Sequence, residues 1–188
     1  MLNDKYHKVF INDFINNRGF TSISESKTGE LTHTGMSLPG DDLIYNTELQ
    51  VNGVPFFITK DENNLDNIEL EGQLVPFKIT TVKRIHFLSL SCYGSYFQNL
   101  NLFNDEVVVD IKPFYTTELI NKQPAFEKVR TGLFFDYVHN KKGKVTNLTG
   151  TIWHSEIDLA YPKKINAVLF EDNPAIHVFA ITLECEVE

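Results

Sequence analysis

The fold is decided by residues 179–187, which read Phe-Ala-Ile-Thr-Leu-Glu-Cys-Glu-Val. Apolar side chains recur at every second position from Phe179 to Val187, and the positions between them include Thr182 and Glu184. Successive side chains of a β-strand point to opposite faces of the sheet. The pattern therefore predicts a long antiparallel strand with one buried and one solvated face.

The same period of two recurs upstream. In residues 106–112, Val107, Val109 and Ile111 alternate with charged residues, except that Val108 breaks the pattern. Other runs of suitable length lie between clusters of Gly, Pro, Asn or Lys, which are typical of turns. We expect these further strands at residues 53–59, 66–77, 83–93, 132–139, 150–159 and 165–170.

Helical periodicity is scarce. Leu2, Tyr6, Phe10 and Phe14 are spaced by four, so residues 1–13 are expected to form a short helix or an extended arm. No alternation of strands with helices indicates a parallel sheet, and no repeat or linker divides the chain. We therefore predict one all-β domain over residues 1–188, an antiparallel β-sandwich with short helical turns only.

Two short segments predict local features. Residues 139–144 are polar and contain Gly143 between two apolar runs, so they are expected to form a hairpin turn with solvated charges. Residues 61–66 gather oxygen ligands suited to calcium, but they lack the central glycine and final glutamate of an EF-hand loop. A solvated loop is the preferred interpretation there, calcium is the alternative, and no other cofactor is expected.

Composition restricts the partners. The 188 residues include 17 basic and 25 acidic side chains, a formal charge of -8, which disfavours nucleic acid as a partner. The sequence shows neither a secretory signal nor a run of about 20 apolar residues. We expect a cytoplasmic protein without membrane contact. Cys92 and Cys185 lie in apolar stretches and are interpreted as free, slowly reacting thiols.

No motif with the spacing of a catalytic site is present. The six histidines form no pair with zinc-site spacing, and no nucleophile elbow or phosphate-binding loop is complete. Glu156 and Asp158 would share one face of a strand, where two carboxylates could act as acid and base. Acidic pairs of this kind are common on exposed strands, so an enzyme remains an alternative interpretation only.

Aromatic residues give the strongest indication of a binding site. Trp153, the only tryptophan, is followed by His154, and Tyr93 and Tyr96 flank a glycine at the end of a predicted strand. Sugar binding requires an aromatic plate surrounded by hydrogen-bonding groups. We expect these four residues to form a ligand site if the two segments are neighbours, although for Trp153 itself packing in the core is the preferred interpretation.

Five phrases, in order, resemble a bacterial family of jelly-roll modules similar to the galactose-binding-like and carbohydrate-binding domains of glycoside hydrolases. The most distinctive is residues 66–73, Asp-Asn-Ile-Glu-Leu-Glu-Gly-Gln. The remaining phrases are residues 14–20, 53–57, 85–94 and 175–183. The resemblance implies a jelly-roll sandwich with a role related to sugars.

Within these phrases, the motif residues are expected to hold turns and buried backbone groups rather than to touch ligand. They are Asn16, Asp66, Asn67, Gly72 and Gln73. The resulting hypothesis is a non-catalytic binding module for a carbohydrate or a sugar-bearing molecule. Its alternatives are a small carbohydrate-active enzyme that uses strand carboxylates, and a structural protein whose sheet mediates assembly, for example as a homo-oligomer.

Overall fold

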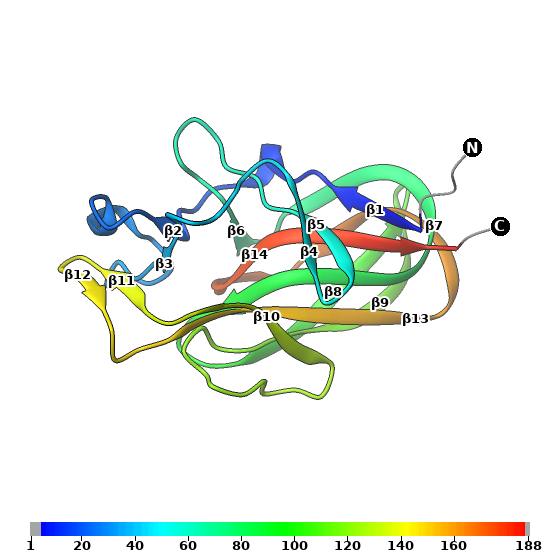
Figure 1. Cartoon of the computed structure of the whole chain (residues 1–188). Helices are drawn as coiled ribbons and strands as arrows, with labels where there is room; N and C mark the ends of the chain where they lie inside the picture. The colour runs from blue at the N-terminus through cyan, green and yellow to red at the C-terminus, as the bar shows by residue number, and fades with distance from the viewer. Residues whose placement is uncertain (1–4, 187–188) are drawn as a thin grey trace.

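The computed structural model describes residues 5–186, and nearly all of its regular elements are β-strands (Figure 1). Within this range the helical elements are two single turns, η1 (Asn12–Phe14) and η2 (Ser26–Thr28). The expected all-β architecture is confirmed. The shorter strands are β1 (Tyr6–Val9), β2 (Phe20–Thr21), β3 (Leu38–Pro39), β4 (Glu48–Val51), β5 (Val54–Phe57), β6 (Ile68–Glu71), β11 (Val138–Asn140) and β12 (Gly143–Val145).

The longer strands build one main antiparallel sheet. They are β7 (Leu74–Ser91), β8 (Tyr96–Asn104), β9 (Val107–Thr116), β10 (Val129–Phe135), β13 (Gly150–Phe170) and β14 (Asp172–Cys185). The order across the sheet is β1-β14-β7-β13-β8-β9, with β6 also paired to β14 and β10 to β13. The jelly-roll connectivity that the resemblance implies stays a prediction.

The two longest strands, β7 and β13, pair along most of their length and bend together. Their register is interrupted between Asp158 and Lys163, where β13 turns at one end of the molecule (Figure 1). β10 pairs with residues 150–155 of β13, whereas β8 pairs with residues 167–170. The two ends of β13 therefore belong to two half-sheets. The first half-sheet contains residues 150–158 of β13 with β10, β14 and residues 84–91 of β7, and the second contains residues 163–170 of β13 with β8, β9 and residues 74–82 of β7.

The first core fills the space between these half-sheets. Phe87 and Ile157 come from the first half-sheet, and Val75, Leu100 and Val168 come from the second, and all five are buried in one cluster. Burial of apolar surface on this scale is the main force that holds a sandwich together.

The second core lies on the opposite face of the first half-sheet. There the N-terminal segment and the β4–β5 hairpin contribute Phe20 and Phe56, which belong to the same buried cluster as Leu88, Leu90 and Phe179. Since the first half-sheet is covered on both faces, its strands carry consecutive buried residues. This double coverage explains why clean alternation is lost in the middle of the chain.

Of the short helix and the extended arm expected for residues 1–13, the described residues form the extended alternative at β1. Tyr6–Val9 is β1, which pairs with β14 through Tyr6 opposite Glu184 and Val9 opposite Ile181, and Leu2 lies outside the described residues. Pairing with a sheet edge satisfies the backbone of this segment, and β-branched Val9 suits a strand. Weak helical spacing is therefore overridden by tertiary context.

The predicted turns are present. β11 and β12 form a hairpin in which Asn140 lies opposite Gly143, and the φ of Gly143 is 114°. Gly72, with a φ of 81°, separates β6 from β7 where a bend was expected. Among residues 5–186, no helix is both long and apolar enough to cross a bilayer.

Both cysteines are free, but their environments differ. Cys92 is buried, and burial raises the pKa of its thiol to about 12, whereas Cys185 is half-buried near the end of β14. We expect a thiol reagent to label Cys185 slowly in the native protein and Cys92 only after unfolding, because the thiolate is the reactive form. Rapid native labelling of Cys92, measured by mass spectrometry, would contradict this prediction.

Candidate functional site

Trp153 lies in the second core and is 1% exposed. Its indole N–H donates to the Glu118 carbonyl at 3.1 Å, so its polar atom is also satisfied internally. The exposed stacking platform considered for Trp153 is therefore not available at this residue. The physical reason is that β13 is covered on both faces along this stretch.

We expect the fluorescence of Trp153 to report this burial. Emission should be blue-shifted and resistant to iodide quenching in the native protein, and both properties should change on unfolding, since an indole packed against apolar side chains is shielded from water. Strong quenching by iodide before unfolding would contradict the buried position.

His154 is fully buried and lies in a chain of hydrogen bonds. The Asn52 amide donates to the Thr131 carbonyl at 2.9 Å, and the same nitrogen is 3.2 Å from Nδ1 of His154. That Nδ1 is therefore the acceptor, and Nε2 carries the proton toward Nδ1 of His86, 3.0 Å away. Nε2 of His86 then faces Glu184 at 3.4 Å. Burial lowers the pKa of His154 to about 3, so His154 is uncharged within this chain of hydrogen bonds.

His86, His154 and Glu156 form the single group of three side chains in residues 5–186 whose donor atoms lie close enough to hold a metal, all within 4.8 Å. The surroundings of His154 do not suit that role. Nδ1 of His154 faces donors from both Asn52 and Arg130, so the proton must occupy Nε2, the atom that a metal would need. The donor set favours a hydrogen-bond chain over a metal site.

Glu156 and Asp158 share a face of β13, as expected, but both are held in ion pairs. Arg130 contacts Glu156 at 2.9 Å, and Asp158 contacts Lys128 at 2.6 Å and Arg84 at 2.5 Å. The hydrogen bond from Lys128 lowers the pKa of Asp158. A general acid requires a raised pKa, so this arrangement does not favour acid-base chemistry.

The calcium alternative concerned the loop of residues 61–66. Oδ1 of Asp61 accepts the backbone N–H groups of Asn63 and Leu65, which closes the loop on itself. Asp66 is buried, and its two oxygens accept the N–H groups of Gly19 and Phe20 at 2.8 and 2.9 Å. The carboxylate of Asp66 therefore points into the protein interior and not toward an ion in the loop.

Tyr93 lies in the turn that follows β7, and Tyr96 is the first residue of β8. Tyr93 has a φ of 66°, which is uncommon for a residue with a side chain, and the residue is 56% exposed. The Tyr96 hydroxyl donates to the Tyr93 carbonyl at 3.1 Å and helps to fix the turn. His154 does not join them, because its ring contacts Phe56 and His86 instead.

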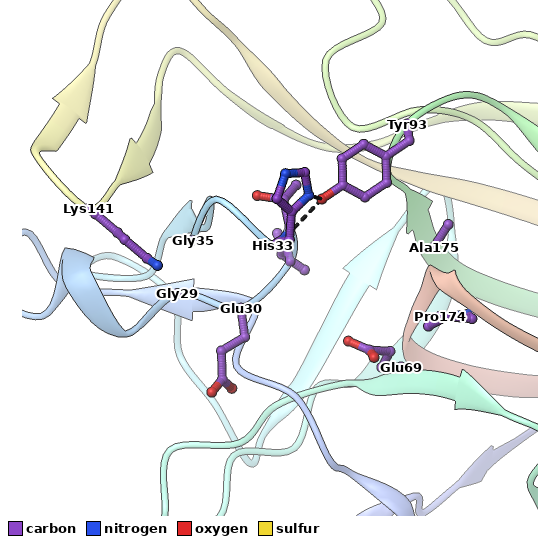
Figure 2. A pocket seen from close by; sticks show the side chains of 11 residues that line it. Gly29, Glu30, His33, Gly35, Glu69, Tyr93, Lys141, Pro174 and Ala175 are labelled. Carbon is purple, nitrogen blue, oxygen red and sulfur yellow. Dashed lines mark hydrogen bonds between the residues drawn. The ribbon is translucent and has the colours of Figure 1, made fainter.

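His33, which the sequence did not single out, stacks on Tyr93. The two ring centroids are 5.3 Å apart and the planes differ by 25°. The Tyr93 hydroxyl accepts the backbone N–H of His33 at 2.8 Å and also contacts Nδ1 of that ring (Figure 2). This pair fixes the loop of residues 29–36 against the end of β7 and presents an exposed aromatic surface.

The pair borders a cavity of about 510 Å³, called here the large cavity. The loop of residues 29–35 forms one side, and Glu69, Pro174 and Ala175 form the other, while Lys141 comes from the β11–β12 hairpin (Figure 2). Its volume lies in the range of small-molecule sites. The lining contains both polar and apolar groups, which suits a ligand with both kinds of surface.

Glu69 supplies a fixed carboxylate to the large cavity. Its Oε2 accepts a hydrogen bond from the Asn17 amide at 2.8 Å, and among the described residues no lysine or arginine forms an ion pair with it. Burial raises the pKa of Glu69, and the nearby charge of Glu71 raises it further. A carboxylate with one oxygen engaged retains acceptor capacity for a ligand.

A buried network of polar side chains holds Asn17, the hydrogen-bond partner of Glu69, in place. The Asn67 amide donates to Oδ1 of Asn17 at 3.2 Å and to Asp66 at 2.9 Å, and its Oδ1 accepts from His177 at 2.9 Å. Asn17 in turn binds Glu69 and the Glu30 carbonyl. The network connects three chain segments and positions the cavity wall.

The other motif residues also contact backbone groups. Asn16 accepts the Glu69 N–H at 2.7 Å, and the Gln73 side chain accepts the Glu71 N–H at 2.8 Å and donates to the Glu69 carbonyl at 2.9 Å. Together with Gly72, these residues hold β6 and its turn. They orient Glu69 and do not line the large cavity.

The model of the AziU2-like β-sandwich domain matches residues 7–187. The chain belongs to this family. The AziU2-like match extends over nearly the whole sequence, so both half-sheets and the large cavity fall within it. No curated protein matches the chain in sequence.

Proposed function

We propose that this AziU2-like domain is a non-catalytic binding module for a carbohydrate or a sugar-bearing molecule, and that the large cavity is its site. The observation that carries the proposal is the exposed Tyr93–His33 pair beside a cavity with several polar side chains. A sugar ring offers apolar C–H faces framed by hydroxyl groups, and such a lining complements both. The jelly-roll resemblance agrees with this assignment.

Each polar group has a role in the proposal. The carboxylates of Glu30 and Glu69 accept hydrogen bonds from sugar hydroxyls, and Lys141 donates to them. Pro174 and Ala175 contribute apolar contacts between these groups. None of these contacts requires a metal or a covalent bond between the ligand and the protein.

A thermal-shift and calorimetry screen over neutral, amino and acidic sugars tests the proposal. Tyr93→Ala is expected to weaken binding of the best sugar by about tenfold or more, because an aromatic contact is worth on the order of 1 kcal/mol beyond its buried area. Tyr161→Ala is the matched control, since Tyr161 is a 77% exposed tyrosine that does not line the cavity. If no sugar of the panel binds, or if wild type and Tyr93→Ala bind the best sugar with equal affinity, the proposal is overturned.

Self-association is a weaker alternative. β9 forms one end of the sheet and exposes Val107, Val108 and Ile111. A bulge in its pairing with β8 and a proline at position 113 interrupt this edge, and both features discourage a further strand from pairing. We expect light scattering at micromolar concentration to report a monomer. A stable oligomer that binds none of the sugars would favour assembly instead.

A further inference from the structure

A second, smaller cavity of about 160 Å³ lies next to the large one. Thr32 and Tyr93 line both cavities, so they form a shared wall. The tyrosine is fixed within this wall, because its hydroxyl accepts the N–H of His33 and its carbonyl accepts the hydroxyl of Tyr96. A ligand that covers Tyr93 from the large cavity reaches the small cavity without leaving the protein surface.

The two cavities differ in chemistry. The large cavity carries the charged side chains of Glu30, Glu69 and Lys141. The small cavity exposes a mainly apolar surface, to which Met36, Cys92, Leu119 and Ile120 contribute, and Thr34 and Glu118 also line it. The Cys92 thiol stays protonated at neutral pH because burial raises its pKa, so Glu118 is the one acidic side chain of this lining.

We propose that the ligand is a glycoside with an apolar aglycone, whose sugar ring occupies the large cavity and whose aglycone occupies the small one. The inference rests on the proposed function and adds the second half of the ligand. A sugar alone leaves the apolar lining of the small cavity in water, whereas an apolar group buries it at a gain of about 25 cal/mol per Å². A dry apolar cavity of about 150 Å³ holds a benzene ring in another protein, so a single aryl ring fits here.

Matched pairs of methyl and phenyl glycosides test this assignment. The probes are the α- and β-anomers of glucose, galactose and mannose, titrated by calorimetry against the full chain. For the preferred sugar, the phenyl glycoside is expected to bind at least tenfold more tightly than the methyl glycoside. The ratio of the two affinities isolates the aglycone contact, because the sugar part is common to both.

Two substitutions test the contribution of each cavity to binding separately. Ile120→Asp places a charge in the small cavity at a residue that is 39% exposed, so folding should survive. It is expected to reduce the phenyl-to-methyl ratio to near one without weakening the methyl glycoside. Glu69→Gln should weaken both glycosides by a similar factor and keep the ratio. Ile79→Asp is the control, since Ile79 is 49% exposed and lines neither cavity.

The outcomes distinguish the two proposals. Methyl glycoside binding with a ratio near one in the wild type would overturn the aglycone assignment and leave sugar binding in place. A high ratio that Ile120→Asp does not change would also overturn it, because the aryl group would then lie elsewhere. If no glycoside of either kind binds, the proposed function fails, and the assignment that rests on it fails too.

Discussion

Replacing Asp66 with alanine is expected to lower the free energy of unfolding by several kcal/mol. The carboxylate accepts three hydrogen bonds, from the N–H groups of Gly19 and Phe20 and from the Asn67 amide, and it is fully buried. Each buried donor left without a partner costs about 1–3 kcal/mol. A loss of this size is a large fraction of the net stability of a domain.

Urea unfolding followed by circular dichroism measures this loss. Asp42→Ala is the matched control, because Asp42 is exposed and should change stability by less than about 0.5 kcal/mol. Asp66→Asn keeps the shape of the side chain but turns a donor toward a backbone N–H, so an intermediate loss is expected. It remains measurable if the alanine variant does not fold. Wild-type stability of both Asp66 variants would contradict the role assigned to this carboxylate.

Acidification below about pH 6.5 is expected to destabilise the protein through its buried histidines. Burial lowers the pKa of His154 to about 3 and of His177 to about 4, from an ordinary value of 6.5. As the pH falls, the unfolded chain therefore takes up these protons before the folded protein does. Each histidine removes about 1.4 kcal/mol of stability per pH unit in this window.

Asp66 acts in the opposite direction. Burial raises its pKa to about 7 from 3.8, so the folded protein holds a proton that the unfolded chain releases, and stability rises as the pH falls through this range. Between about pH 6 and 4, His154 and His177 each lower the stability as the pH falls, whereas Asp66 raises it. The free energy of unfolding therefore falls by about 1.4 kcal/mol per pH unit. The pKa values of His86 and His139 are also lowered by burial and steepen the loss.

The unfolding free energy measured from pH 7 to 4 checks this dependence. His154→Gln removes one titrating group and should flatten the slope by about one proton. A free energy that is flat or rises on acidification of the wild type would contradict the prediction.

Much of the fold was accessible from the sequence because strand alternation is a local signal. Residues 179–187 predicted a strand that β14 contains up to Cys185, and Gly72 and Gly143 marked real turns. Coverage of the first half-sheet on both faces was not accessible. It depends on where residues 16–60 fold back, which no local pattern encodes, and it decides that Trp153 is buried.

The candidate site was only partly predictable for the same reason. Tyr93 stood out as an aromatic residue in a turn, but His33 lies 60 residues away and meets it only in the folded chain. Glu69 belongs to the Asp-Asn phrase and could have been noticed there as a carboxylate beside a fixed turn. Lys141 looked like one solvated charge among several in a hairpin.

The position of β14 has a consequence for synthesis on the ribosome. This strand lies between β1 and β7 rather than at the edge of the sheet, so β1 has no partner strand until residues 172–185 have emerged. The nascent chain must therefore expose the edge of β7 and part of both cores during most of its translation. Such exposed edges and apolar surfaces bind chaperones and other incompletely folded chains. The yield of folded protein in cells should therefore depend on how fast β14 is synthesised and pairs with β1 and β7.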